Sequence, residues 1–174
     1  MSVKKNTSPP SKKRPPGEIL VGVVSDTHGL LRPQVLAALE GCELILHAGD
    51  VGGVDILREL RNIAPTFAVR GNVDRRGPES LLPMTQVVEV GGLHLYVLHE
   101  INKLDLPPAA AGFAAVIYGH SHSPLAEMRG QVLYYNPGSC GPRRFSLPVS
   151  MGFLRIHKGK LKAELLTLKC GADE

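Results

Sequence analysis

The sequence lacks long apolar runs and paired cysteines. Its longest apolar stretch, Ile19–Val24, is far shorter than the roughly 20 residues that a membrane-spanning helix requires, and no apolar signal region follows the N-terminus. The three cysteines, Cys42, Cys140 and Cys170, are odd in number and widely spaced, so they predict neither a disulfide framework nor a zinc ribbon. These absences predict a cytoplasmic protein with no membrane span.

Acidic residues are absent from the first 17 positions. This segment holds five Lys and Arg residues, and removing its charge of +5 from the net charge of +4 leaves −1 for residues 18–174. The rest of the chain therefore has no general positive charge to hold a polyanion, which disfavours nucleic acid as a partner. Because the segment is rich in Pro, Lys and Ser, we predict a disordered basic tail over residues 1–17. Docking of this tail to nucleic acid or a membrane surface is the less favoured alternative.

The remaining residues are sufficient for one buried core. With 174 residues in all and 43% hydrophobic content, the chain is too short for two full domains. No internal repeat or inner linker interrupts residues 18–174. We therefore expect a single globular domain over that range.

Short apolar runs alternate with helical patterns in the first half, and strand patterns dominate the second half. We expect helices within residues 33–41 and 56–63, and a short helix or loop at 107–112. The predicted strands lie at residues 19–24, 44–46, 67–69, 87–90, 93–98 and 115–118, with two ribbons at 125–135 and 151–168. This mixture predicts an α/β fold, a four-layer α/β/β/α sandwich in which two facing mixed β-sheets are flanked by helices.

Five polar motifs each follow a predicted strand. In order they are Asp26-Thr27-His28, Gly49-Asp50, Gly71-Asn72-Val73-Asp74, His99, and Gly119-His120-Ser121-His122. Ligands of open α/β sheets bind outside the carboxyl ends of the strands, so these residues can converge on one site. In extended chain, side chains two positions apart point the same way, which would direct both residues of each Asp-x-His or His-x-His pair to that site.

Apart from Asp74, the motifs together offer two carboxylates, one amide oxygen and four imidazoles. These are too many ligands for one tetrahedral ion, and they suit two ions that share a bridging carboxylate. Ligation rich in imidazole favours manganese, iron, zinc or cobalt over magnesium. The sequence therefore predicts a site for two divalent metal ions, with manganese as the first choice and nickel, cobalt, iron and zinc as alternatives.

In this order the motifs resemble the calcineurin-like metallophosphoesterase superfamily, over residues 21 to about 149. The chain looks most like the small single-domain bacterial and archaeal phosphodiesterases, with which it shares the turn at residues 136–139. The resemblance implies a first metal held by Asp26, His28, Asp50 and His122, and a second held by Asp50, Asn72, His99 and His120. Asp50 would be the bridge.

The resemblance also implies a function. We expect a phosphodiesterase that hydrolyses a small phosphodiester through a hydroxide bridging the two metals, with Asp50, His99 and Asp74 in catalytic positions. By the same resemblance, a homodimer or homotetramer is expected. The alternatives are a scaffold or binding module of the same fold with little catalysis, and a small nuclease that uses the basic tail.

Two positions depart from the common pattern of the superfamily. Asp74 stands where many members have a histidine that supports the leaving group, and a carboxylate near two cations stays ionised and donates protons poorly. Direct substrate contact, the orienting of a ligand histidine and the capping of a turn are all open as roles for Asp74. Glu100 follows His99 where many members have glycine, so the shape of that loop is expected to differ.

The other polar candidates carry no motif. His47, His94 and His157 are assigned no chemistry, and the turn at residues 136–139 is interpreted as structural. Six arginines could clamp phosphate oxygens, although each taken singly is more often a solvated charge. They are Arg32, Arg70, Arg75, Arg76, Arg143 and Arg144.

Overall fold

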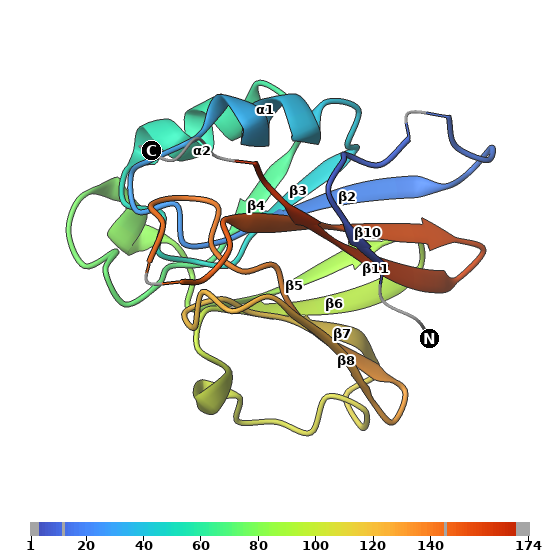
Figure 1. Ribbon diagram of the computed structural model, residues 1–174. Coiled ribbons are helices and arrows are strands. Elements are labelled where there is room, and N and C mark those ends of the chain that lie inside the picture. Colours follow the sequence, from blue (N-terminus) through green and yellow to red (C-terminus); the bar gives the residue numbers. More distant parts are fainter. Residues whose placement is uncertain (1–3, 12, 145, 170–174) are drawn as a thin grey trace.

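Two β-sheets face each other in the computed structural model, which describes residues 4–11, 13–144 and 146–169 (Figure 1). The first sheet contains, in spatial order, β1 (Lys4–Asn6), β11 (Lys160–Thr167), β10 (Ser150–His157), β2 (Ile19–Val24), β3 (Leu44–His47) and β4 (Thr66–Ala68). The second contains β5 (Thr85–Val90), β6 (Leu93–Leu98), β7 (Phe113–Ile117), β9 (Val132–Asn136) and β8 (Leu125–Arg129). Both sheets are mixed, as predicted.

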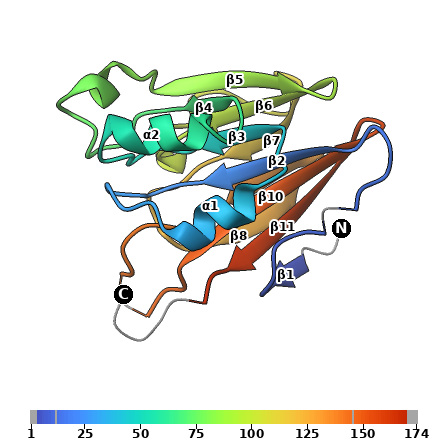
Figure 2. The ribbon, with the colours of Figure 1, turned by 90° about the horizontal axis from the view of Figure 1, so that it is seen from above.

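Two helices cover the outer face of the first sheet, α1 (Pro33–Leu39) and α2 (Val54–Arg61). Figure 2 shows both from above, lying across this sheet. Proline at the first position of α1 has the backbone angle that a helix start requires. Gly41 follows α1 with a φ of 84°, in the left-handed conformation expected there.

The core lies in two layers on either side of the first sheet. Along β2, Leu20 and Val24 pack with the helices, whereas Val21 and Val23 pack between the two sheets. A strand that is apolar on both faces is typical of a sheet buried on both sides. The first sheet therefore separates the helical layer from the apolar layer between the two sheets.

The outer face of the second sheet is covered by the segment that follows β6. This segment contains the 3₁₀ turn η2 (Ile101–Lys103), and apolar residues of the segment pack on Tyr96, Val116 and Tyr118. The fourth layer of the predicted sandwich is thus a 3₁₀ turn and a loop. A second 3₁₀ turn, η1 (Pro78–Leu81), lies in the connection between β4 and β5. Among the described residues, no helix is long and apolar enough to cross a bilayer.

The N-terminal segment differs from the predicted disordered tail where the structure describes it. Strand β1 pairs in parallel with β11, and Arg14 lies 2.6 Å from a carboxylate oxygen of Glu43. The physical reason is that an edge strand pairs through backbone N–H and C=O groups, so a sequence poor in apolar side chains can still join a sheet.

Parallel pairing sets the position of the motifs. Strands β2, β3 and β4 run parallel, and so do β6 and β7. Their carboxyl ends therefore share one edge of each sheet. The loops that begin there carry all five polar motifs.

Candidate metal centre

Four of the five loops bring six titratable side chains into two groups. Within each group, the potential ligand atoms all lie within 4.8 Å of one another. The first ligand group is Asp26, His28 and His122, and the second ligand group is Asp50, His99 and His120. All six are residues that the sequence predicts as metal ligands.

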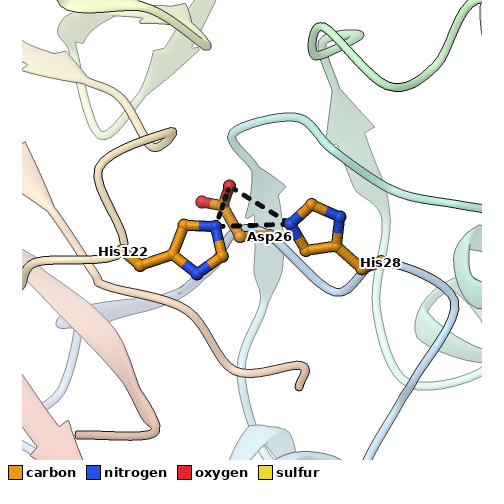
Figure 3. Close-up of side chains that lie close together, drawn as sticks. All are labelled: Asp26, His28 and His122. Carbon is orange, nitrogen blue, oxygen red and sulfur yellow. Dashed lines mark hydrogen bonds and ion pairs between the residues drawn. The ribbon is translucent and has the colours of Figure 1, made fainter. Parts of the chain in front are cut away.

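The first ligand group directs three ligand atoms at one point (Figure 3). Nε2 of His28 lies 3.3 Å from Nε2 of His122. The Oδ1 atom of Asp26 lies 3.2 Å from Nε2 of His122 and 3.9 Å from Nε2 of His28. Two imidazole nitrogens and a carboxylate oxygen in this arrangement form a set of ligands for a transition metal.

Asp26 is oriented through its other oxygen. Oδ2 accepts hydrogen bonds from the Ser25 hydroxyl at 2.6 Å and from the His120 backbone N–H at 3.1 Å. Oδ1 is buried and has no hydrogen-bond partner among the described residues. Because a buried carboxylate oxygen without a partner is costly, a cation fits this position.

The second ligand group is linked by the side-chain oxygen of Asn72. That oxygen lies 3.1 Å from Nε2 of His99 and 2.9 Å from Nδ1 of His120. Nδ1 of His99 is 2.7 Å from the Ala48 carbonyl oxygen, which can only accept. In the neutral ring, Nδ1 therefore carries the proton and Nε2 is left as the metal-binding nitrogen.

Asp50 lies between the two groups. Its Oδ1 atom is 3.3 Å from Nε2 of His99, and its Oδ2 atom is 3.8 Å from Nε2 of His28. The Val73 backbone N–H donates to Oδ1 at 3.0 Å. The two oxygens of one carboxylate thus face different groups.

Charge and burial act in opposite directions on these residues. Burial tends to raise the pKa of Asp50, but hydrogen bonds from His99 and Val73 lower it below its ordinary value. Burial tends to lower the pKa of His99, and the hydrogen bond to Asp50 raises it above its ordinary value. Burial lowers the pKa of His28 by more than Asp50 and Asp26 raise it, which favours the neutral ring that binds metals.

The ligand residues have unusual backbone conformations. Among the described residues other than glycine, six have positive φ, and five of these six are predicted ligands. They are Asp26, His28, Asp50, His120 and His122, with φ between 46° and 69°. The prediction that the two pairs are oriented by extended chain is therefore wrong, because left-handed turns direct both members of each pair. Such conformations are disfavoured for these residues, and they cluster at functional sites.

Two glycines of the motifs allow close approach. A β-carbon at Gly71 would overlap the Asp50 carboxylate, and one at Gly119 would overlap the Ser25 hydroxyl and crowd Asp26. The glycines that precede Asn72 and His120 are therefore explained by space that the carboxylates occupy.

Asp74 is buried and points toward the backbone. Its Oδ2 atom accepts from the N–H groups of Val51 at 3.0 Å and Gly71 at 2.8 Å, and its Oδ1 atom accepts from Gly52 at 2.9 Å. Both oxygens are thus engaged with two of the ligand-bearing loops. Of the predicted roles, this geometry fits the capping of loops.

His47 has a structural link to the site that its sequence context does not indicate. It is fully buried; its Nδ1 accepts from the Gly49 N–H at 3.2 Å, and its Nε2 lies 2.9 Å from the Thr27 hydroxyl. That hydroxyl donates to the Val51 carbonyl at 2.8 Å. Burial lowers the pKa of His47 to about 4, so the ring is neutral. The sequence signal for this role is that His47 lies three residues before Asp50, at the end of a buried strand.

The turn at residues 136–139 supports the loop of the two histidines, as predicted for a structural element. The Asn136 side chain donates to the Gly119 carbonyl at 2.9 Å and to the Ser121 hydroxyl at 3.0 Å. Of the predicted arginines, Arg32 is buried and donates to the Gly141 carbonyl. Arg144 is exposed, and it is close enough to lower the pKa of His28.

Comparison with known proteins identifies the family. The model of the calcineurin-like phosphoesterase superfamily domain matches residues 19–159. A probable metallophosphoesterase of Methanothermobacter thermautotrophicus is 36% identical over 159 residues, which cover 85% of this chain and 92% of that protein. The chain therefore belongs to the calcineurin-like phosphoesterase superfamily, a family of metal-dependent phosphoric ester hydrolases. This confirms the resemblance and the enzyme class that the motifs predict.

Solved structures show the same fold. An archaeal phosphodiesterase superposes with a TM-score of 0.69 at 25% identity, covering 85% of this chain and 100% of that chain. Vacuolar protein sorting 29 from Cryptosporidium parvum also superposes with a TM-score of 0.69, at 18% identity, covering 85% and 96%. The second likeness concerns the fold alone. Together with the facing mixed sheets, these matches confirm the predicted metallophosphoesterase fold.

Proposed function

We propose that this chain is a phosphodiesterase that works with two divalent metal ions, one at each ligand group. The observation that carries the proposal is the position of Asp50, whose Oδ1 faces His99 of the second group while Oδ2 faces His28 of the first. A carboxylate in that position can bind both ions at once. The buried Oδ1 atom of Asp26, which has no hydrogen-bond partner among the described residues, supports an ion at the first group.

The proposed ligands follow from these groups. Asp26, His28, His122 and Asp50 would hold the first ion, and Asp50, Asn72, His99 and His120 would hold the second. When bound, such ions supply a deprotonated water as nucleophile and neutralise charge on the phosphoryl oxygens. The imidazole-rich ligand set favours manganese, with nickel, cobalt, iron and zinc as alternatives.

The protein groups around the ions have distinct tasks. The Ala48 carbonyl fixes the tautomer of His99, so that Nε2 would be free to bind the second ion. His120 is exposed and is available to a substrate that approaches from solvent. Asp74 holds the loops of Asp50 and Asn72 through three backbone N–H groups, so we assign it to positioning. Without a histidine at that place, the enzyme suits diesters with good leaving groups, for which proton donation matters least.

The direct experiment is restoration of activity by single metals. Protein stripped with chelator is given manganese, nickel, cobalt, zinc, iron or magnesium, and is assayed on bis(p-nitrophenyl) phosphate and p-nitrophenyl phosphate. We expect turnover that depends on metal, is highest on the diester, and disappears in Asp50→Ala. If no metal restores turnover although two ions bind per chain, the protein is a scaffold of this fold instead. Loss of oligonucleotide cleavage on deletion of residues 1–17 would instead favour the nuclease.

We further propose that the protein is cytoplasmic and forms a homodimer or homotetramer. Cys42 and Cys140 are buried free thiols, which suits a reducing compartment. Burial raises the pKa of each to about 12, so both stay protonated. Cys170 lies outside the described residues. Cell fractionation and light scattering of the purified protein test the two statements; a secreted or a monomeric protein would contradict them.

A further inference from the structure

A cavity of about 460 Å³ adjoins the second ligand group. Two residues of the proposed metal site, Asn72 and His99, form part of its wall. A volume of this size is within the range of small-molecule pockets, about 300–1,000 Å³. A phosphodiester bound at the proposed metal site would therefore have room for one ester arm in this cavity.

The wall of the cavity carries charges of both signs. The cations are Arg70, Arg75 and Lys103, and the carboxylates are Glu100, Asp105 and the buried Asp74, whose oxygens accept from backbone N–H groups.

Several of these charged groups are held in place by recorded contacts. The Lys103 ammonium lies 2.6 Å from the Glu100 carboxylate, and Arg70 donates to the Ser80 carbonyl at 3.2 Å. Arg75 donates through Nε to the Asn72 carbonyl at 2.7 Å. Since a guanidinium has five N–H donors, this contact uses one of them. The wall therefore offers hydrogen-bond donors and acceptors in fixed positions.

This chemistry discriminates among possible ester arms. A wholly apolar arm would remove water from charged groups without replacing their hydrogen bonds, which is costly. The cations of the wall would attract an arm with further phosphates and the carboxylates would repel it, so charge gives such an arm no clear advantage. A hydroxyl group both donates and accepts, so it can satisfy carboxylates and cations together. The side chains of Met84, Tyr96 and Leu98 complete the wall and suit the carbon skeleton of such an arm.

We infer that this cavity is a binding subsite for a polyhydroxylated ester arm, such as glycerol or a sugar, of the phosphodiester substrate. The inference rests on the proposed function and adds the class of substrate. It predicts that selectivity for the ester arm arises beside the second ligand group, because His99 of that group also lines the cavity.

The test uses three p-nitrophenyl diesters that differ in the second arm, which is glycerol, thymidine 5′-linked or ethyl. We expect kcat/KM to be about 10-fold or more higher for the glycerol or nucleoside arm than for the ethyl arm. A preference for only one of the two hydroxylated arms would identify the source of the hydroxyls. Equal kcat/KM for all three arms would overturn the inference and leave the proposed function standing.

Filling the cavity provides the matched variants. Met84 is half exposed, so Met84→Trp can fold while it occupies the space. The same change at the half-exposed Met128, on β8, is the control. We expect Met84→Trp to raise KM for the hydroxylated arms about 10-fold and to leave the ethyl diester within about 2-fold, with Met128→Trp unchanged on all three. Equal losses on all three arms in Met84→Trp would overturn the inference.

A binding measurement separates this inference from the proposed function. Calorimetry on manganese-loaded protein compares glycerol 3-phosphate with ethyl phosphate, both monoester products. Tighter binding of glycerol 3-phosphate, lost when Lys103→Met is combined with Asp105→Leu, supports the subsite even if turnover is absent. Equal affinities overturn it, whatever the turnover.

Discussion

The first and second ligand groups differ in how the chain holds their metal-binding atoms. In the second, the Ala48 carbonyl orients His99, and Asn72 links His99 to His120. In the first, Nδ1 of His122 and Oδ1 of Asp26 are buried without hydrogen-bond partners among the described residues. Hydrogen bonds of this kind strengthen metal binding by orienting the ligands. The histidines of the second group are therefore oriented in advance, whereas in the first group hydrogen bonds orient Asp26 through Oδ2 but leave Nδ1 of His122 without a partner among the described residues.

Substitution of Asp50, the carboxylate that faces both groups, should affect both proposed ions and has the largest expected effect. In Asp50→Asn both ions lose a ligand, so we expect kcat/KM on a diester to fall on the order of 10³-fold or more. Metal analysis should show fewer than two ions per chain. Full metal content with full activity would contradict the bridging role.

Single histidine variants should sharpen the comparison. His99→Ala should remove the tighter ion and His122→Ala the weaker one, each with a loss of activity of roughly 10²- to 10³-fold. Manganese is titrated into stripped wild-type protein, and the heat of each addition is measured by calorimetry. This titration should resolve one tight and one weaker site. In His122→Ala the tight site should persist. Persistence of the tight site in His99→Ala would reverse our ranking of the two groups.

The pH dependence of stability tests the role of His47, which supports the loops of both ligand groups. His47 has a pKa of about 4 in the folded protein and an ordinary value of 6.5. Between these values the unfolded state binds a proton that the native state does not, so the free energy of unfolding falls as pH falls. The full effect is about 3 kcal/mol. Urea denaturation of metal-free protein from pH 7 to 4 should show a shallower decline in His47→Gln, and equal slopes would contradict this account.

The smallest expected effect concerns the loops that carry Asp50 and Asn72. Asp74→Asn replaces one acceptor oxygen with a donor opposite backbone N–H groups, so we expect a loss of about 2 kcal/mol in the free energy of unfolding. Asp55→Asn, at an exposed position of α2, is the control and should change little. Thermal denaturation measures both. If Asp74→Asn instead has normal stability and a changed substrate range, Asp74 contacts the substrate.

The sequence was sufficient to predict the strands from β2 onward and the side chains that form the two groups, because apolar runs mark the strands and the motifs follow them. It did not predict how the ligands are directed, since left-handed φ at Asp26 or His122 depends on contacts between loops distant in sequence. The backbone partners of Asp74 and the place of His47 were missed for the same reason. The pairing of β1 was missed because it uses backbone groups, which composition does not reveal.

Both groups draw on both sheets, since Asp26, His28, Asp50 and Asn72 follow strands of the first sheet and His99, His120 and His122 follow strands of the second. Bound ions would consequently act as clasps across the sandwich. A pulling force that slides one sheet over the other has to break metal–ligand bonds before the apolar layer between the sheets can shear. The loaded protein should thus be mechanically stiffest at its catalytic edge, and chelation should soften that edge first.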